Sequence, residues 1–242
     1  MREIREGEIN WDLILWKYFR PERFIDSLES GELYFAAANE FADPFEGAVA
    51  VQQNLPPPDP RYAEIEGVEK AFRELTRLTK LSCWHTADFE SDAMWKLYAG
   101  VHKGIAIRTT PQRMRDAFDP FKLEPTYDEE SLYAGLVEYL DLTRVRLRSA
   151  GNIQRFFVKH RAFEWEREFR LAISLTQAEE NGVVVPEKGV RVSVDMNQLV
   201  ERIILGTTIT PDEREMVFVH AERLGFADRI EVSSLLGTPR YI

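Results

Sequence analysis

One charged stretch organises this sequence: Glu164-Trp165-Glu166-Arg167-Glu168-Phe169-Arg170-Leu171-Ala172-Ile173-Ser174-Leu175. A β-strand over this stretch would direct alternate side chains to opposite faces. One face would then carry a charged row, formed by Glu164, Glu166, Glu168 and Arg170. Carboxylates and a guanidinium in one row perturb each other's pKa values where water is partly excluded. The row therefore predicts either a functional site or an exposed, charged edge of a sheet.

Length and composition indicate a globular protein of the cytoplasm. The chain has 242 residues, of which 44% are hydrophobic and 30% are charged, and we expect a single domain over residues 1–242. The single cysteine, Cys83, excludes an internal disulfide and fits a reducing compartment. The charged start of the chain predicts no secretion signal, and no run approaches the roughly 20 apolar residues that cross a bilayer.

The net charge limits the partners. A formal charge of −10 argues against general binding of nucleic acid, because contact with phosphates needs a basic surface. A local basic pocket still suits a small anionic or nucleotide ligand. We expect no membrane partner, and the sequence identifies no protein partner.

Short predicted strands and separated helices indicate the α+β class. Strands are expected at 13–19, 33–37, 81–86, 104–109, 136–140, 164–175, 183–185, 190–194, 200–205 and 230–233. Helices are expected at 21–30, 62–80, 92–99, 111–118, 153–160 and 211–224. We expect a twisted, mixed and mostly antiparallel sheet with helices packed on it. The Pro-rich residues 55–60 form an internal loop rather than a domain boundary, because two strands and one helix do not fold alone.

A polar loop at 39–47 is the second candidate for function. Asp43-Pro44 favours a turn, and Phe41 and Phe45 would anchor the loop. Asp43 and Glu46 would then be left free to act, as loop residues on a rigid scaffold often do. The alternative is a plain connection with two hydrophobic anchors. Near Cys83 and His102, nothing at ligand spacing completes a metal set, so we predict no metal site.

Several motifs in one order resemble bacterial domain-of-unknown-function family 2971. These motifs are Lys17-Tyr18, Asp43-Pro44-Phe45-Glu46, Met94-Trp95 with Tyr98, His102-Lys103-Gly104, and the patch of Glu166, Glu168 and Arg170. The chain departs from the family pattern at Ala42, where asparagine is usual, and at His85, where serine is usual. The resemblance covers about residues 15–175. Among the residues of these motifs, we expect substrate or cofactor binding by Asp43, Glu46, Trp95, Tyr98, Lys103 and Arg170.

A more distant likeness is to the ADP-ribosyltransferase fold, a split sheet that uses NAD. This likeness implies that Lys17, Tyr18 or Arg20 takes the position of the first-strand motif. It further implies that Tyr34 takes the second position and that Glu166 or Glu168 is the catalytic glutamate. NAD would then be the co-substrate, with its pyrophosphate held by Lys17 or Arg20 and a ring stacked on an aromatic side chain.

The sequence thus leaves three functions open. The first is an NAD-consuming enzyme of the ADP-ribosyltransferase type, in which a fixed carboxylate stabilises positive charge on the ribose. The second is a non-catalytic module that binds a nucleotide or a partner in a bacterial defence or stress system. The third is a metal-dependent phosphoester hydrolase that gathers carboxylates around a hard cation.

Overall fold

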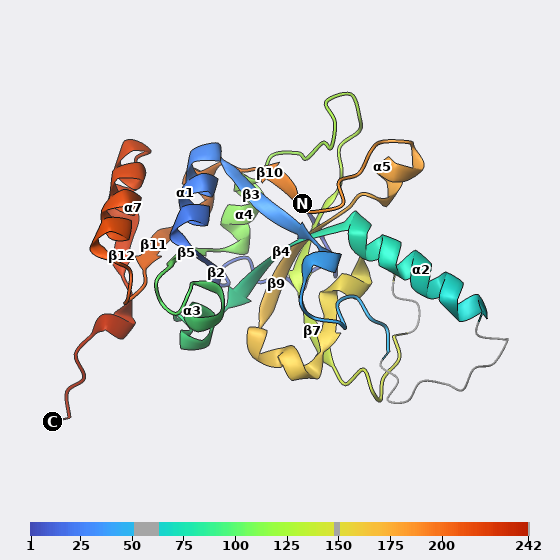
Figure 1. Cartoon of the computed structure of the whole chain (residues 1–242), viewed down its shortest axis with the longest axis horizontal. Helices are drawn as coiled ribbons and strands as arrows, with labels where there is room; N and C mark the ends of the chain where they lie inside the picture. Colours follow the sequence, from blue (N-terminus) through green and yellow to red (C-terminus); the bar gives the residue numbers. More distant parts are fainter. Residues whose placement is uncertain (51–62, 148–150, 242) are drawn as a thin grey trace. The chain divides into compact units, whose positions relative to one another are not determined.

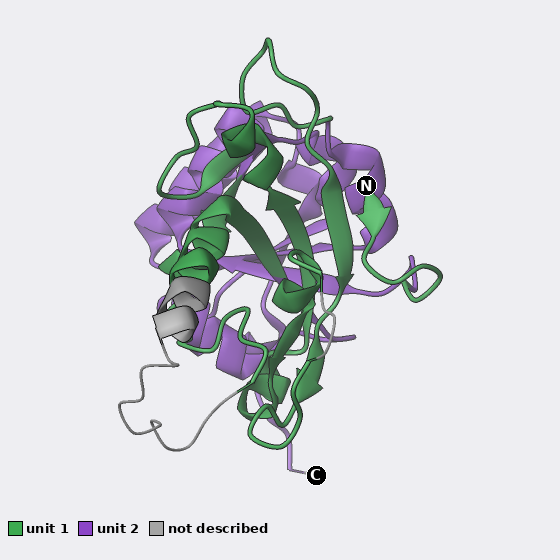
Figure 2. Ribbon diagram, turned by 90° about the vertical axis from the view of Figure 1, so that its right-hand side faces the viewer, with its two compact units in different colours: residues 1–9, 34–83, 120–191 green, residues 10–33, 84–119, 192–242 purple. Residues whose placement is uncertain are grey.

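A computed structural model describes residues 1–50, 63–147 and 151–241, with side chains described outside residues 63–69. The chain forms two compact units, each assembled from three segments (Figure 2). Unit 1 comprises Met1–Ile9, Tyr34–Cys83 and Pro120–Arg191, and unit 2 comprises Asn10–Leu33, Trp84–Asp119 and Val192–Ile242. Three strands are divided between the units: β3 (Glu32–Ala37), β4 (Thr79–Thr86) and β10 (Val190–Ser193). The Pro-rich loop at 55–60 lies outside the described residues, and one domain over the whole chain stays a prediction.

Unit 1 holds short strands with helices between them (Figure 1). Its strands are β1 (Arg2–Glu3), β6 (Leu132–Leu136), β7 (Glu138–Leu140), β8 (Val158–His160) and β9 (Glu168–Ser174). Its helices are α2 (Ala63–Leu78), α5 (Thr176–Glu180) and the 3-10 turns η1 (Ala38–Glu40), η3 (Gln154–Phe157) and η4 (Arg161–Glu166). β6 pairs antiparallel with β9 and parallel with β1, whereas β7 and β8 form a separate parallel pair.

The core of unit 1 packs helix, turn and strand residues against each other. Phe156 and Phe157 of η3, Leu75 of α2, Leu81 of β4 and Ala172 of β9 form one buried cluster. All seven residues of β9 except Ser174 are buried. The burial of apolar side chains on both faces of β9 makes this strand a rigid support for the charged residues at its start.

Unit 2 is organised around β2 (Leu15–Phe19), which pairs antiparallel with the end of β4 and with β5 (Ile105–Thr109). β5 pairs antiparallel with β11 (Arg202–Leu205), and β11 pairs parallel with β12 (Ile230–Val232). Its helices are α1 (Pro21–Ser30), α3 (Asp92–Tyr98), α4 (Pro111–Ala117), α6 (Met196–Leu199), α7 (Pro211–Arg223) and the 3-10 turns η5 (Ala227–Arg229) and η6 (Ser234–Leu236). Trp16, Trp95, Ala106 and Ile204 lie in its core.

The predicted α+β class and the mixed, mostly antiparallel pairing are confirmed. Several predicted elements are wrong. The strand expected over 164–175 is reduced to Glu168–Ser174, and the helix expected over 153–160 is the turn η3 followed by β8. Residues 183–185 form no strand, and the strand expected over 136–140 is interrupted at Val137 between β6 and β7. None of the described helices combines the length and the apolar character that a bilayer span requires.

Candidate functional site

The turn before β9 places two glutamates together. η4 is capped at its start by His160, whose Nδ1 accepts the N–H of Ala162, and at its end by Arg167. Arg167 adopts a left-handed conformation with φ 44° and ψ 58°, which is uncommon for a residue with a side chain. The chain therefore turns between Glu166 and Glu168 instead of continuing as a strand. The two side chains come within hydrogen-bonding distance of each other.

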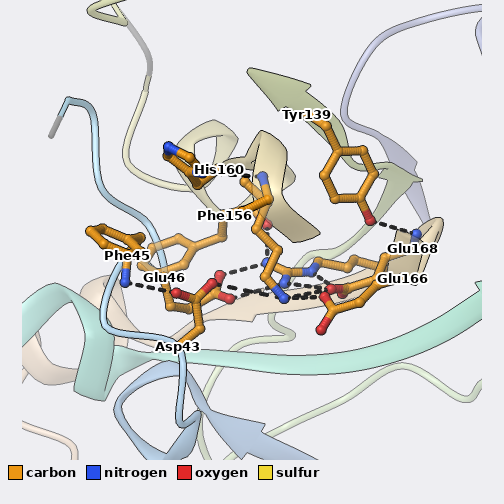
Figure 3. Close-up of polar contacts among 11 residues, drawn as sticks. Asp43, Phe45, Glu46, Tyr139, Phe156, His160, Glu166 and Glu168 are labelled. Carbon is orange, nitrogen blue, oxygen red and sulfur yellow. Dashed lines mark hydrogen bonds and ion pairs between the residues drawn. The ribbon is translucent and has the colours of Figure 1, made fainter. Parts of the chain in front are cut away.

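The predicted row of four charges is therefore wrong in its geometry, because Glu164 does not join it. Glu164 lies on η4 with its side chain 61% exposed, and its Oε2 is 3.3 Å from Nε of Arg161. The other three members of the row, Glu166, Glu168 and Arg170, are buried together. They form the charged cluster of unit 1, which comprises Asp43, Glu46, Lys159, Glu166, Glu168 and Arg170 (Figure 3).

Arg170 is the fully buried cation of the charged cluster. Its Nη1 and Nη2 donate to the two carboxylate oxygens of Glu46 at 2.5 and 2.9 Å. Its Nε donates to Oε2 of Glu168 at 2.6 Å, and Nη1 also donates to the carbonyl oxygen of Phe156 at 2.7 Å. Such a paired fork fixes the position and orientation of both carboxylates.

Lys159 is the second cation of the charged cluster, and it pairs with Glu168 as Arg170 does. Its ammonium donates to Oε2 of Glu166 and, at 2.9 Å, to Oε1 of Glu168. Its Nζ also lies 3.8 Å from Oδ2 of Asp43. The Phe163 ring packs 4.8 Å from the same Nζ. With its side chain 5% exposed, Lys159 is held by partners and not by water.

The loop after η1 supplies the remaining two carboxylates. Asp43 is fixed through Oδ1, which accepts the N–H of Phe45 at 2.8 Å, as expected for a turn that begins at an aspartate. The prediction that Glu46 stays free is wrong, because Glu46 is buried and paired with Arg170. Gly47 lets the loop pass close to the core: its φ is +73°, and an added Cβ would lie 2.6 Å from Cε1 of Phe156.

The two glutamates have opposite pKa shifts. Burial and the hydrogen bond from its carboxyl to Glu168 raise the pKa of Glu166 to about 7. Burial alone would raise the pKa of Glu168 as well, but the charges of Arg170 and Lys159 hold it well below its ordinary value. A pair of carboxyl groups with separated pKa values is the arrangement that lets one group carry a proton while the other stays ionised.

Two further residues touch this pair. The hydroxyl oxygen of Tyr139 on β7 accepts the N–H of Glu168 at 2.8 Å. Burial and the nearby charge of Glu168 raise the pKa of Tyr139, so the phenol stays neutral. Burial and Glu168 likewise raise the pKa of the Cys83 thiol, which disfavours a thiolate nucleophile at this position.

Six of the other candidate binding residues lie in unit 2, and five of these are Lys17, Tyr18, Trp95, Tyr98 and Lys103. Lys17 Nζ lies 5.1 Å from the Trp84 ring, and the Tyr18 ring meets the edge of Trp95 at 5.1 Å. Trp95 is fully buried and donates its indole N–H to Glu90 at 2.8 Å. Tyr98 and Lys103 are exposed near α3.

The remaining two candidates, Arg20 and Tyr34, lie in different units. Arg20 is exposed at the start of α1 in unit 2. Tyr34, in unit 1, hydrogen-bonds to Glu40 and to the N–H of Gly189 rather than to the charged cluster. The predicted convergence of the early basic and aromatic residues with the late glutamates involves both units and stays a prediction.

Sequence reasoning missed the central role of Lys159 and the contact of Tyr139. The helix expected over 153–160 gives the Lys159 side chain no defined direction, whereas β8 directs it into the charged cluster. No sequence signal marks Tyr139, because its contact with Glu168 depends on the pairing of β7 with β8. Within the described part of the chain, no group of three or more His, Cys, Asp or Glu side chains is arranged to hold a metal ion.

Comparison with known proteins finds no matching family model, no matching curated protein and no matching solved structure. The resemblance to family 2971 and the likeness to the ADP-ribosyltransferase fold therefore stay predictions from the sequence.

Proposed function

We propose that this protein is an enzyme that cleaves the glycosidic bond of a nucleotide, with NAD as the expected substrate, and that Glu166 and Glu168 perform the chemistry. The observation that carries the proposal is the pair of adjacent buried carboxyl groups whose pKa values are shifted in opposite directions. Perturbed carboxyl pairs of this kind recur at acid–base sites.

The chemistry assigns one role to each carboxyl group. When the bond between ribose C1′ and the nicotinamide nitrogen breaks, its electron pair leaves with neutral nicotinamide and positive charge develops on the ribose. The Glu168 carboxylate, kept ionised by Arg170 and Lys159, stabilises that charge electrostatically. Glu166 accepts the proton of the incoming hydroxyl nucleophile as the new C1′–O bond forms. A pKa near 7 suits this base, because it is ionised in part of the molecules at neutral pH and returns its proton to solvent afterwards.

The test is the release of nicotinamide from NAD by the purified full chain, followed with Glu166→Gln and Glu168→Gln. Loss of an electrostatic or acid–base group of this kind lowers kcat by about 100- to 1,000-fold. Glu164→Gln is the matched control, because it changes an exposed carboxylate two residues away that pairs with Arg161. A folded wild-type protein that releases no nicotinamide, or glutamine variants as active as the control, would reject the proposal.

A non-catalytic binding role is the second candidate, and a feature of unit 2 favours it. Phe89, Leu97, Tyr98 and Val101 are all more than half exposed along one short segment around α3. Exposed apolar residues that gather in this way are typical of surfaces that bind partners. Titration calorimetry against a panel of nucleotides, with turnover checked in the same sample, separates the two functions: binding without turnover supports the module and contradicts the enzyme.

The third candidate, a metal-dependent phosphoester hydrolase, has no comparable support. The carboxylates of Glu46 and Glu168 are already occupied by the guanidinium of Arg170, and Lys159 occupies Glu166. A divalent cation at this position would need both basic side chains to leave.

A further inference from the structure

The charged cluster contains more acid than base. Its four carboxyl groups face two cations, and the six side chains are at most 8% exposed. With every carboxyl ionised, the net charge of the cluster would be −2, which is costly to bury. Burial of this excess negative charge favours a proton on Glu166, and the pKa of Glu166 is raised accordingly, whereas Glu168 stays ionised.

Asp43 is the member of the cluster that lacks a full set of partners. Its Oδ2 is buried without a hydrogen-bond donor, although Oδ1 is bonded to the N–H of Phe45. A buried carboxylate oxygen in that state costs free energy until a donor reaches it. The described donor facing this oxygen is the Lys159 ammonium, 3.8 Å away, which is about 1 Å longer than a charge-assisted hydrogen bond.

We infer that Lys159 is the positioning residue of the Glu166–Glu168 pair and that Asp43 is its alternative partner. In one arrangement, the one described above, the ammonium donates to Glu166 and Glu168. In the other arrangement, it moves toward Oδ2 of Asp43 and leaves Glu166. The flexible four-carbon side chain of lysine permits such a shift without movement of the backbone.

Each arrangement favours a different protonation state of Glu166. When Lys159 donates to Glu166, the ammonium stabilises the carboxylate and favours release of the proton. When Lys159 moves to Asp43, Glu166 loses a donor and holds the proton more tightly. The movement and the proton transfer are thus coupled, and no other reactant is needed. This assignment rests on the proposed function for its role in turnover, but the coupling itself is a property of the resting protein.

The other charged or titratable groups facing the pair do not offer the same exchange. Arg170 is fixed by Glu46 and by the Phe156 carbonyl, and Tyr139 and Cys83 have raised pKa values and stay neutral. Among the described cations that contact the pair, Lys159 is the one that faces a further carboxylate to which it is not yet hydrogen-bonded. The quantity to measure is therefore how strongly Asp43 and Lys159 depend on each other in their effect on the pKa of Glu166.

The experiment is a double-mutant cycle of Asp43→Asn and Lys159→Met, read out as the titration of the Glu166 carboxyl carbon by ¹³C NMR. The signal is assigned by its loss in Glu166→Gln. We expect Lys159→Met to raise the pKa of Glu166 by at least one unit, which is a tenfold change in proton affinity. We expect Asp43→Asn to lower the pKa of Glu166. In the Lys159→Met background, the same substitution should change the proton affinity of Glu166 by a factor at least threefold smaller. Glu164→Gln should leave the titration unchanged.

Additive shifts in the cycle would overturn the inference, because they would show that Asp43 and Lys159 act on Glu166 independently. If Lys159→Met does not fold, the Lys159 ammonium resonance replaces it as the readout in the wild type and in Asp43→Asn. Titration of Glu166 should move that resonance in the wild type and move it less in Asp43→Asn, and equal movement would overturn the inference. Nicotinamide release is measured separately, so a coupled titration without turnover rejects the proposed function alone.

Discussion

Replacement of Arg170 by methionine tests whether the charged cluster is held together as the contacts indicate. Arg170 is completely buried and donates to Glu46, Glu168 and the carbonyl oxygen of Phe156. Methionine retains much of the side-chain volume but leaves the Glu46 carboxylate, 3% exposed, without its cation. Removal of one partner of a buried ion pair typically costs about 3–5 kcal/mol. Because whole domains unfold with about 5–15 kcal/mol, we expect a large loss of stability.

The assay is urea denaturation at pH 7 followed by tryptophan fluorescence, with Arg144→Met as the matched control. Arg144 pairs with Asp141 at 3.4 Å, but its side chain is 85% exposed. Exposed pairs contribute about 0–1 kcal/mol, so the same substitution at position 144 should change the unfolding free energy little. The double variant Glu46→Gln/Arg170→Met should lose less than the sum of the single variants, because it removes both charges. A loss below about 1 kcal/mol for Arg170→Met would refute this account of the cluster.

Three further predictions concern single groups of unit 1. The pKa of Glu166 in the folded protein, about 7, lies above its unfolded value near 4.5. Glu166 therefore adds to the free energy of unfolding in full below pH 4.5, and this contribution is lost as the pH rises through 7. Glu166→Gln should flatten that part of the stability profile in denaturation curves from pH 4.5 to 8. Gly47→Ala places a side chain on a left-handed backbone and against Phe156, so the free energy of unfolding should fall by about 1–3 kcal/mol in the same urea assay. Gly182→Ala is the control, because Gly182 has φ +82° and open space around it, and should show only the smaller backbone cost. Lys80→Met removes the ammonium that donates to the carbonyl oxygens of Arg77, Pro186 and Lys188 at 2.8, 2.8 and 2.6 Å. We expect the free energy of unfolding to fall by about 1–3 kcal/mol and amide hydrogen exchange over 183–189 to become faster. Unchanged exchange over 183–189 would contradict this role of Lys80.

Elements marked by local signals were predicted well from the sequence. Helix α1 begins with Pro21 at its first turn and ends at Gly31, whose φ of 65° is the left-handed conformation that a helix terminus favours. Helix α7 likewise begins at Pro211, after Thr210 caps it. Proline, glycine and capping side chains determine such ends through contacts within a few residues, so their effects can be predicted without knowledge of the fold.

Elements at the charged cluster were predicted less well, because nothing local determines them. Residues 164–175 satisfy the alternation of a strand, but Arg167 takes a left-handed conformation and η4 takes up the first three residues, Glu164 to Glu166. An arginine in the sequence does not indicate a left-handed backbone conformation, since glycine or asparagine usually occupies that conformation. Lys159 was placed on a helix for the same reason, because the apolar spacing of 153–160 is compatible with more than one structure.

The sequence nevertheless predicts that Glu166, Glu168 and Arg170 form a group. Residues close in sequence can be grouped by pattern, but their chemistry depends on partners that are distant in sequence. Glu46 is 124 positions from Arg170, and Arg170 is the main charge that lowers the pKa of Glu168. The sequence predicts that Asp43 and Glu46 are both free to act, yet Glu46 is paired with Arg170, whereas Oδ2 of Asp43 has no hydrogen-bond donor. Glu46 therefore serves stability, whereas Asp43 retains an oxygen that a donor can still reach, and this difference between two carboxylates of one loop arises only in the folded chain.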